Sequence, residues 1–325
     1  MNCRTPRNKT PARCAEITGD LRMKLTAQQV AGNTWCIVQP RAMVPYYQLN
    51  EREIILLDSG CMLHGELEEW LEGQGLRVRA ILNTHDHWDH VAANAALQQR
   101  QGSRIYLPRL EAAAHASPLA FKAGHENGNY REVEAFWQQF PYAVDEEIGL
   151  EDGPLEVCGA VFEVIHTPGH SVDHVAFRTP DDVLYVGDTL MSGRLLRQAK
   201  LSYALSHEVD LESKEKLRRY HCAAYILAHG SIEQELEALI DENLRYIRQR
   251  AETVWRSIEK PMSMEQIIRA VWRELGLHAG AYYYRTLETG NMIRSLVQLL
   301  CSEGRLEHRF EDGVEHFNRA GTWEA

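Results

Sequence analysis

The stretch THDHWDH, residues 84–90, decides how the rest of this chain is interpreted. It follows an apolar run, Ala80-Ile81-Leu82, that is typical of a buried strand. The stretch contains four candidate metal ligands, which are His85, His87, Asp89 and His90. Two histidines separated by one residue lie on the same side of an extended segment, and imidazole with carboxylate suits a borderline metal such as zinc. The stretch therefore predicts a metal site after this strand.

A plainer interpretation is a polar loop that ends in a helix cap. Asp89 and His90 open a predicted helix that continues over residues 91–98, and an aspartate at this place can act as an N-cap. A cap needs one such residue, whereas this loop has four. We therefore favour a metal site, and one short loop of this form can supply ligands to two adjacent ions.

Other strand-like apolar runs also end in polar residues. These residues are Asp58 after residues 54–57, His170 after the run 164–165 and a Pro-Gly turn, Asp188 after residues 183–187, and His229 after residues 224–228. Loops that follow the carboxyl ends of strands often carry functional residues in α/β scaffolds. Each example alone is weak, because a residue of this type is usually a cap or a turn. Together they favour one shared site.

In their order along the chain these motifs resemble the metallo-β-lactamase fold superfamily, over roughly residues 25–235. The resemblance implies an α+β fold, a four-layer αβ/βα sandwich with the metals in a groove at one edge. One departure is Ala228, since relatives usually have glycine before the last histidine. We expect two Zn²⁺ ions, with Mn²⁺ or Fe²⁺ as alternatives, because metal availability matters as much as ligand type.

The resemblance also assigns residues to each ion. It implies that His85, His87 and His170 bind the first metal. It implies that Asp89, His90 and His229 bind the second, and that Asp188 bridges both. Asp58 and His174 are expected to support the ligands from behind, because such partners fix the tautomer and the direction of a ligand ring.

A binuclear hydrolase is the activity that the resemblance implies. Zinc lowers the pKa of its bound water to about 7, so that a metal-bound hydroxide forms at neutral pH. Asp89 is the carboxylate expected to orient this hydroxide and to pass its proton to the leaving group. The expected reaction is cleavage of an acyl bond, in a thioester, ester or lactone, of a small-molecule substrate.

Two other activities stay open. The segment from His170 to His174 and the overall layout are similar to the endoribonucleases of the lactamase-B2-like branch. A mononuclear-iron persulfide dioxygenase would bind its iron through His85, His170 and Asp188. The C-terminal region lacks the basic and aromatic pattern with which glyoxalase II binds glutathione, so that particular thioester is disfavoured.

Composition limits the partners and the compartment. The chain has 325 residues and a net charge of -11, which disfavours nucleic acid as a partner. No apolar run approaches the length of a membrane span, and the N-terminus lacks the apolar core of a secretory signal. The seven scattered cysteines form no C-x-x-C pair, which indicates a reducing compartment. We therefore expect a cytoplasmic enzyme without a membrane segment.

Both ends of the chain differ from the middle. Residues 1–24 carry a net charge of +4 and are predicted to be a disordered basic tail. Residues 236–325 are predicted to form a long helix and a small winged-helix-like domain. Its expected parts are an amphipathic helix over 232–258, helices over 264–275 and 291–303, and a hairpin that turns at Asp312-Gly313.

This C-terminal region is not expected to bind DNA. From residue 260 onward it has eight basic and nine acidic residues, and the helix at 291–303 offers only Arg294 as a base. An interaction or site-closing role is the remaining interpretation. The long amphipathic helix is either a spacer packed on the first domain or a homodimer contact.

Substrate contacts are the least constrained part of the prediction. Met43, Tyr46 and Tyr47 follow an early loop that often overhangs the metals in the superfamily, and Arg194 lies in a predicted loop over residues 191–200. Packing against the sheet is an equally good interpretation for the tyrosines. Residues 109–148, with predicted helices at 110–116 and 130–139 and a turn-rich loop at 122–129, are expected to wall the site. His115 and His125 of this segment are expected to be solvated.

Overall fold

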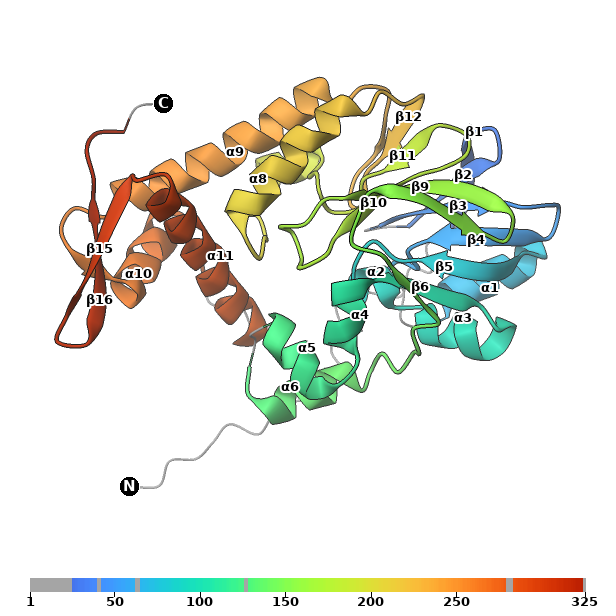
Figure 1. The fold of residues 1–325 in the computed structure, drawn as a ribbon, viewed down its shortest axis with the longest axis horizontal. Helices are drawn as coiled ribbons and strands as arrows, with labels where there is room; N and C mark the ends of the chain where they lie inside the picture. The colour runs from blue at the N-terminus through green and yellow to red at the C-terminus, as the bar shows by residue number, and fades with distance from the viewer. Residues whose placement is uncertain (1–24, 40–41, 62–64, 126–127, 279–282, 324–325) are drawn as a thin grey trace.

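Two facing β-sheets form the larger part of this protein, and helices cover their outer sides (Figure 1). The computed structural model describes residues 25–39, 42–61, 65–125, 128–278 and 283–323. The basic tail predicted over residues 1–24 lies outside these residues. No helix in the described part is both long enough and apolar enough to cross a membrane.

The first sheet has seven strands in chain order. They are β1 (Thr26–Ala31), β2 (Thr34–Val38), β3 (Met43–Gln48), β4 (Glu53–Leu57), β5 (Arg77–Leu82), β6 (Arg104–Pro108) and β7 (Glu146–Ile148). The pairs from β1 to β4 are antiparallel, and the pairs from β4 to β7 are parallel. The parallel strands therefore end at one edge of the sheet, and the THDHWDH loop leaves β5 at that edge.

The second sheet has six strands in the order β13-β12-β11-β10-β9-β8. They are β8 (Gly153–Val157), β9 (Ala160–His166), β10 (Val175–Arg178), β11 (Val183–Tyr185), β12 (Ala224–Ile226) and β13 (Ile232–Glu233). The parallel pair β11–β12 brings the segments after both strands, which contain Asp188 and His229, to the same edge. Strands β8 and β9 form an antiparallel hairpin.

Three apolar layers hold this sandwich together. Between the sheets, Leu57 and Leu82 pack in one core with Phe162 and Phe177. The outer face of the first sheet packs against α1 (Glu66–Gln74) and α3 (Asn94–Gln101). The outer face of the second sheet packs against residues from α9 (Glu237–Arg256) and the short turn that follows α8 (His207–Lys216). The predicted four-layer αβ/βα sandwich is confirmed.

Several predicted helices and loops are wrong in detail. The single helix predicted over 91–98 is two helices, α2 (Trp88–Val91) and α3. The turn-rich loop predicted at 122–129 overlaps α5 (Pro118–His125), which follows α4 (Arg109–His115) and precedes α6 (Tyr130–Trp137). The Ser117 hydroxyl accepts a hydrogen bond from Ala120 N at 3.2 Å, and proline is well suited to a first helical position. This Ser-Pro pair is the local signal that marks the start of α5.

Two further corrections concern the second half of the sandwich. The loop predicted over 191–200 contains a helix, α7 (Gly193–Gln198). Helix α8 begins at His207, where Ser206 accepts a hydrogen bond from Val209 N at 3.4 Å. The helix predicted over 232–258 is wrong at its start, because β13 occupies the first residues and α9 begins at Glu237.

The C-terminal region consists of helices and a small sheet. The helices are α10 (Met264–Glu274) and α11 (Tyr283–Ser302). The strands are β14 (Met262–Ser263), β15 (Leu306–Glu311) and β16 (Val314–Arg319), and their order in the sheet is β14-β16-β15. The predicted hairpin is confirmed, whereas α11 begins eight residues before the predicted residue 291. The winged-helix-like character and the domain boundary near residue 235 stay predictions.

Helix α9 connects the two parts of the molecule (Figure 1). Its Ile240 packs in the core on the outer side of the second sheet, and its Ile247 packs in the C-terminal core with residues of α10 and α11. Leu211 of α8 belongs to that same C-terminal core. The apolar face of α9 is therefore buried within the chain, which favours the spacer interpretation over a dimer contact.

Candidate metal centre

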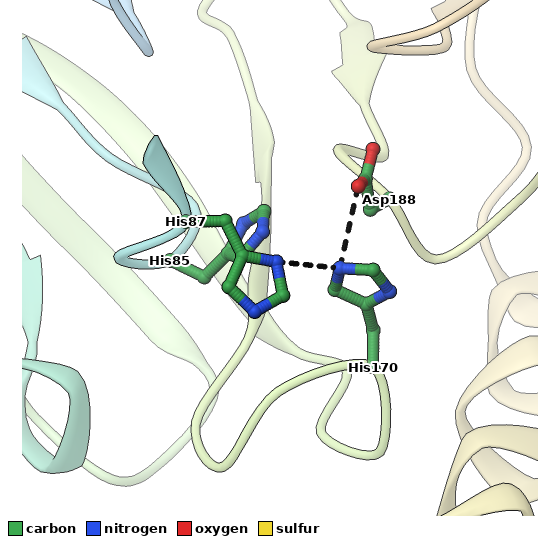
Figure 2. A group of neighbouring side chains, drawn as sticks. All are labelled: His85, His87, His170 and Asp188. Atoms are coloured by element: carbon green, nitrogen blue, oxygen red, sulfur yellow. Dashed lines mark hydrogen bonds and ion pairs between the residues drawn. The ribbon is translucent and has the colours of Figure 1, made fainter. Parts of the chain in front are cut away.

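Histidines from two separate loops meet at the edge of the sandwich. His85 and His87 follow β5, and His170 lies on the loop between β9 and β10 (Figure 2). The His170 Nε2 atom lies 3.1 Å from His87 Nδ1 and 3.3 Å from Asp188 Oδ2. One ligand atom from each of these four residues falls within 4.8 Å of the others. This first group could hold one metal ion.

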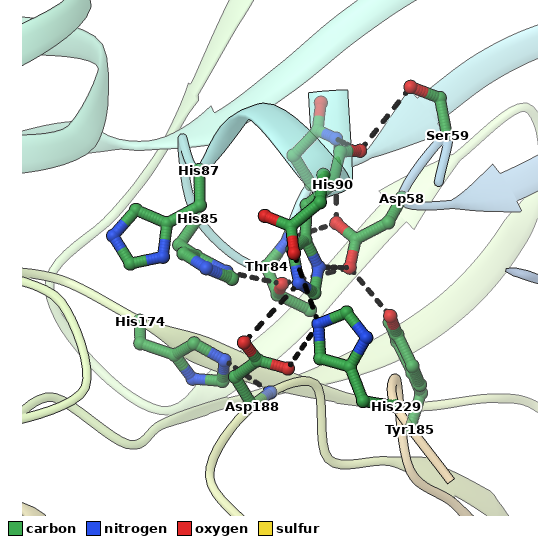
Figure 3. Close-up of polar contacts among 12 residues, drawn as sticks. Asp58, Ser59, Thr84, His85, His87, His90, His174, Tyr185, Asp188 and His229 are labelled. Carbon is green, nitrogen blue, oxygen red and sulfur yellow. Dashed lines mark hydrogen bonds and ion pairs between the residues drawn. The ribbon is translucent and has the colours of Figure 1, made fainter. Parts of the chain in front are cut away.

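A second group lies directly beside the first. Asp89 and His90 at the start of α2 meet His229 from the segment after β12, and their ligand atoms again lie within 4.8 Å of one another. His229 Nε2 is 3.3 Å from Asp89 Oδ2 and 3.4 Å from Asp188 Oδ1. Asp188 directs its other oxygen, Oδ2, toward His90 Nε2 at 3.4 Å (Figure 3). Asp188 therefore lies between the two groups.

In two of the candidate ligand histidines, His85 and His90, the Nδ1 atom lies within hydrogen-bond distance of a neighbouring side chain. Thr84 Oγ1 lies 2.9 Å from His85 Nδ1, and Asp58 Oδ2 lies 2.7 Å from His90 Nδ1. Asp58 also accepts hydrogen bonds from the Thr84 hydroxyl at 2.9 Å and the Tyr185 hydroxyl at 2.7 Å (Figure 3). Such contacts set the ring direction and leave the other nitrogen for a ligand. Asp58 itself has a left-handed backbone, with φ of 61°, which is uncommon for a residue with a side chain.

The inward-facing nitrogens fit a bound cation. His85 Nε2 is buried and has no hydrogen-bond partner among the described residues, and the buried His90 Nε2 has only the 3.4 Å contact with Asp188 Oδ2. Buried polar atoms without partners are rare, because leaving them unpaired costs about 1–3 kcal/mol each. Imidazole nitrogen and carboxylate oxygen are also the donor set that suits zinc and related divalent metals. The residues present therefore fit a metal ion at this place.

The electrostatics of the cluster favour positive charge. The Asp188 carboxylate raises the pKa of His229 to about 12, although burial opposes this shift. Burial disfavours the charged form of His90, but the charges of Asp188 and Asp58 outweigh it and raise that pKa to about 10. Burial likewise opposes ionisation of Asp89, but its hydrogen bond with His229 and the charge of His90 lower the pKa to about 2. The carboxylates thus create a field that would attract a divalent cation.

His174 supports Asp188 rather than joining the ligand groups. It is fully buried, its Nε2 accepts a hydrogen bond from Asp188 N at 3.1 Å, and its Nδ1 lies 2.8 Å from the Thr167 hydroxyl. The position before Asp188 must be glycine, because a Cβ on Gly187 would lie 2.5 Å from the His174 ring. The two residues expected to stand behind the ligands, Asp58 and His174, therefore both lie against them.

The sequence interpretation missed Glu111 on α4. Its buried carboxylate accepts hydrogen bonds from the Ser171 hydroxyl at 2.6 Å, Asp173 N at 3.0 Å and Asp86 N at 3.3 Å. Asp86 stands between two candidate ligands and Ser171 follows a third, so one side chain connects two ligand loops. Burial raises the pKa of Glu111 to about 7, although the hydrogen bond from Ser171 works in the opposite direction.

The expectation that His115 is solvated is wrong. His115 is buried, and its Nδ1 lies 3.0 Å from Asp86 Oδ2. The Tyr142 hydroxyl donates to the other oxygen of Asp86, and the Tyr142 ring stacks on that of His115, with centroids 4.0 Å apart. The segment between β6 and β7 therefore braces the loop that carries His85 and His87. The side chain of His125 lies outside the described residues.

A cavity of about 160 Å³ opens on the candidate ligands His170, Asp188 and His229. Its remaining wall comes from residues that precede α7, from α7, from α8 and the segment before it, and from α9. These wall residues are Leu190, Met191, Leu195, Ser202, Tyr203, Lys214, Asn243, Tyr246 and Ile247. A larger hollow of about 440 Å³ lies beside His115, Trp137 and Tyr142, and none of the candidate ligands lines it.

The residues proposed as substrate contacts lie away from this cavity wall. Tyr46 is buried on the outer side of the first sheet, with its ring stacked on Trp35 at 6.3 Å. Tyr47 and Met43 belong to the packing between the sheets, where Tyr47 meets Phe162 edge to face at 5.7 Å. Arg194 is exposed on α7, next to the cavity residue Leu195. The packing interpretation describes the positions of both tyrosines.

Comparison with known families gives one match over most of the sandwich. A family model described as the metallo-beta-lactamase superfamily matches residues 44–229, which include all seven candidate ligands. Among curated relatives, a hydroxyacylglutathione hydrolase of Chromohalobacter salexigens is 35% identical over 127 residues, which is 38% of each chain. A probable metallo-hydrolase of Bacillus subtilis is 26% identical over 153 residues, covering 47% of this chain and 68% of that protein. The chain spans well under two thirds of the first of these relatives.

Solved structures share the fold over a longer part of the chain. A metallo-beta-lactamase family protein from Thermus thermophilus has a TM-score of 0.66 at 20% identity, covering 86% of this chain and 94% of that one. A beta-lactamase domain protein from Burkholderia ambifaria has a TM-score of 0.64 at 19% identity, covering 90% and 93%. Both matches extend beyond the sandwich into the C-terminal region, and at these identities they show the fold alone.

Proposed function

The chain belongs to the metallo-beta-lactamase superfamily, and on that basis we propose that it is a metal-dependent hydrolase that cleaves an acyl bond of a small molecule. The bond would be a thioester, an ester or a lactone. The observation that carries this proposal is the cluster of seven histidine and aspartate ligands beside a cavity of about 160 Å³. An apolar cavity of roughly this volume accommodates a benzene-sized organic group.

Two ions would occupy the centre in this proposal. His85, His87 and His170 would hold the first, Asp89, His90 and His229 the second, and Asp188 would contact both. We expect Zn²⁺, with Mn²⁺ or Fe²⁺ as alternatives. The bound ions would supply Lewis acidity, which activates water and polarises the acyl carbonyl.

The chain's own residues would orient the water and move its proton. Asp89 lies at the side of the cluster next to His229, and its side chain is 26% exposed, so it can reach a water molecule. As a carboxylate, Asp89 can accept a hydrogen bond from that water. It can then take the proton and deliver it to the leaving group. The Asp58 and Glu111 contacts would keep the surrounding loops fixed during this transfer.

The remaining parts of the proposal concern partners and location. The relatives named as hydroxyacylglutathione hydrolases support a small-molecule thioester as substrate. The net charge of -11 disfavours nucleic acid. Cys36, Cys158, Cys222 and Cys301 are free thiols in the described part of the chain, which agrees with a cytoplasmic location.

Elemental analysis paired with activity assays tests this function. Purified wild type is expected to contain two metal ions per chain and to hydrolyse simple thioesters, and Asp89→Ala is expected to lose that activity by at least about a hundredfold. Asp241→Ala is the matched control, because Asp241 is an exposed aspartate that pairs with the surface residue Arg218. This control should keep full activity.

Two results would replace the proposal. Cleavage of labelled single-stranded RNA that depends on Asp89, with no thioester turnover, would make the protein an endoribonuclease. One iron per chain with neither hydrolytic activity would indicate oxygen chemistry on a sulfur substrate, as in the persulfide dioxygenases.

A further inference from the structure

The cavity beside the candidate metal centre has a wall of unusual composition. Several polar side chains line it, yet their polar atoms are engaged with the protein. The Asn243 amide bonds twice with the backbone of Met191, at 2.9 Å each, and donates to Leu239 O. The Tyr246 hydroxyl donates to Ala199 O at 3.1 Å. These groups are therefore turned toward the chain rather than toward an occupant of the cavity.

The lysine in the wall is also neutralised. Lys214 is buried, and its Nζ lies 2.5 Å from the equally buried carboxylate of Asp210, one turn earlier on α8. The Ser202 hydroxyl lies 3.3 Å from His207 Nε2, so that the Tyr203 hydroxyl is the one wall hydroxyl of the described residues that is left for an occupant. Because Lys214 is already paired with Asp210, neither of them would be free to pair with a charged group in the cavity. Burying an unpaired charge is costly. The occupant is therefore expected to be neutral.

What remains for an occupant to contact is mainly hydrocarbon. Leu190, Met191, Leu195 and Ile247 contribute aliphatic surface. The ring of Tyr203 lies edge to face with the imidazoles of His87 and His170, with centroids 5.2 and 5.3 Å away. One end of the cavity thus reaches the ligand cluster, and the rest extends away from it between α7, α8 and α9.

From this wall we propose that the cavity is the acyl pocket, and that it selects a short, neutral, apolar acyl group of about six carbons. The inference deepens and rests on the proposed hydrolase function. The length follows from the volume, since an apolar cavity of roughly 150 Å³ accommodates a benzene-sized group and this one measures about 160 Å³. In this proposal Ile247 of α9 sets the limit on chain length, because it belongs both to the cavity wall and to the buried C-terminal core.

A chain-length series on the metal-loaded enzyme tests this selection. The probes are N-acetylcysteamine thioesters with unbranched acyl groups of about two to about twelve carbons. We expect kcat/KM to rise about fourfold for each added methylene, corresponding to roughly 0.8 kcal/mol per buried CH₂, and to fall once the chain exceeds about six carbons. The succinyl thioester should react at least about tenfold more slowly than the butyryl thioester of equal length, because its carboxylate would be buried beside groups that are already paired.

Substitutions of Ile247 should move the optimum in a defined direction. Ile247→Ala removes three carbons from the wall and is expected to shift the preferred acyl length by about two to three carbons toward longer chains. Ile247→Phe should shift it toward shorter chains. The matched control is Ile240→Ala, since Ile240 is the same residue type on the same helix and is also 1% exposed, yet it does not line the cavity. Its length profile should equal that of wild type.

A second readout separates this inference from the proposed function. Ketone analogues, in which CH₂ replaces the carbonyl-bound sulfur, cannot be hydrolysed, and calorimetry measures their affinity. Affinity that depends on chain length and shifts in Ile247→Ala but not in Ile240→Ala would support the pocket even if no thioester is cleaved, in which case only the hydrolase proposal fails. Thioester turnover with a flat length profile, or equal profiles in the two alanine variants, would overturn the acyl pocket and leave the hydrolase in place.

Discussion

Glu111 connects two ligand loops through a single carboxylate whose ionisation is opposed by burial. Its pKa is raised from 4.5 to about 7, whereas in the unfolded chain it would return to the ordinary value. Between these two values the folded state binds more protons than the unfolded state. The contribution of Glu111 to stability therefore falls as the pH rises from 4.5 to about 7, and it does not change further above that.

Replacement of Glu111 by glutamine should remove this pH dependence. In the metal-free protein, we expect wild type to lose up to about 3 kcal/mol of unfolding free energy relative to Glu111→Gln between pH 5 and pH 8. Urea denaturation at both pH values measures the difference. Glu147→Gln, at an exposed glutamate, is the control and should track wild type. An equal gap between wild type and Glu111→Gln at both pH values would contradict this account.

The sequence predicted the candidate metal ligands, but it did not predict Glu111, which holds two of the ligand loops together. The alternation in residues 85–90 and the acids and histidines after strands are local signals, and the structure brings these residues together. Glu111 gave no such signal, because its partners Asp86, Ser171 and Asp173 are distant in sequence. A buried acid on a helix is recognisable only once the loops that contact it are placed.

Among the elements, α8 and α11 are joined by a buried polar contact. The Ser295 hydroxyl of α11 accepts a hydrogen bond from His207 N at 2.9 Å, and it lies 2.9 Å from His207 Nδ1. His207 is the first residue of α8, so its N–H has no partner within its own helix. Ser295 therefore supplies, from a neighbouring helix, a hydrogen bond that a helix start usually obtains from its own cap.

Ser295→Ala should weaken this junction measurably. The substitution leaves two buried nitrogen groups of His207 unpaired, and we expect it to reduce the unfolding free energy by about 1–3 kcal/mol. Ser302→Ala is the control on the same helix, because its hydroxyl donates to Leu299 O within α11 and its loss should change stability by less than about 0.5 kcal/mol. Chemical denaturation of both variants makes the comparison, and equal losses would contradict a special role for Ser295.

Strands were easier to predict from this sequence than helices. The apolar runs at residues 54–57, 80–82 and 164–165 all lie within strands, which are β4, β5 and β9. Loops were predicted where α5 and α7 lie, because glycine and polar residues in these helices resemble turn sequences. Their apolar residues, such as Phe121 and Leu196, pack against partners that no local pattern reveals. Tertiary packing decided these segments.

For the whole molecule, the metal centre should also be a source of stability. Seven candidate ligands from four separate segments meet there, and the buried His85 Nε2 lacks a hydrogen-bond partner in the described part of the chain. A ligand that binds only the folded state stabilises it by about 4 kcal/mol at a concentration a thousand times its Kd. Removing the metal with a chelator should therefore lower the Tm by several degrees, and added Zn²⁺ should restore it.

Thermal denaturation with and without chelator makes this measurement. Asp188→Asn should reduce the shift most, because Asp188 lies between the two ligand groups. Asp241→Asn, at an exposed position outside the cluster, should leave the shift unchanged. Identical Tm values with and without chelator in wild type would show that the cluster does not bind metal tightly.

The candidate metal ligands and the part of the cavity wall that lies on α9 are encoded in different parts of the gene. All seven candidate ligands precede residue 230, whereas Asn243, Tyr246 and Ile247 of the cavity wall come from a helix that begins at Glu237. Point mutations or recombination downstream of the last ligand codon can therefore reshape the wall while every ligand stays in place. Proteins with this architecture can therefore change their substrate range by exchanging one C-terminal segment. Each intermediate sequence would keep all the metal ligands and so its catalytic activity.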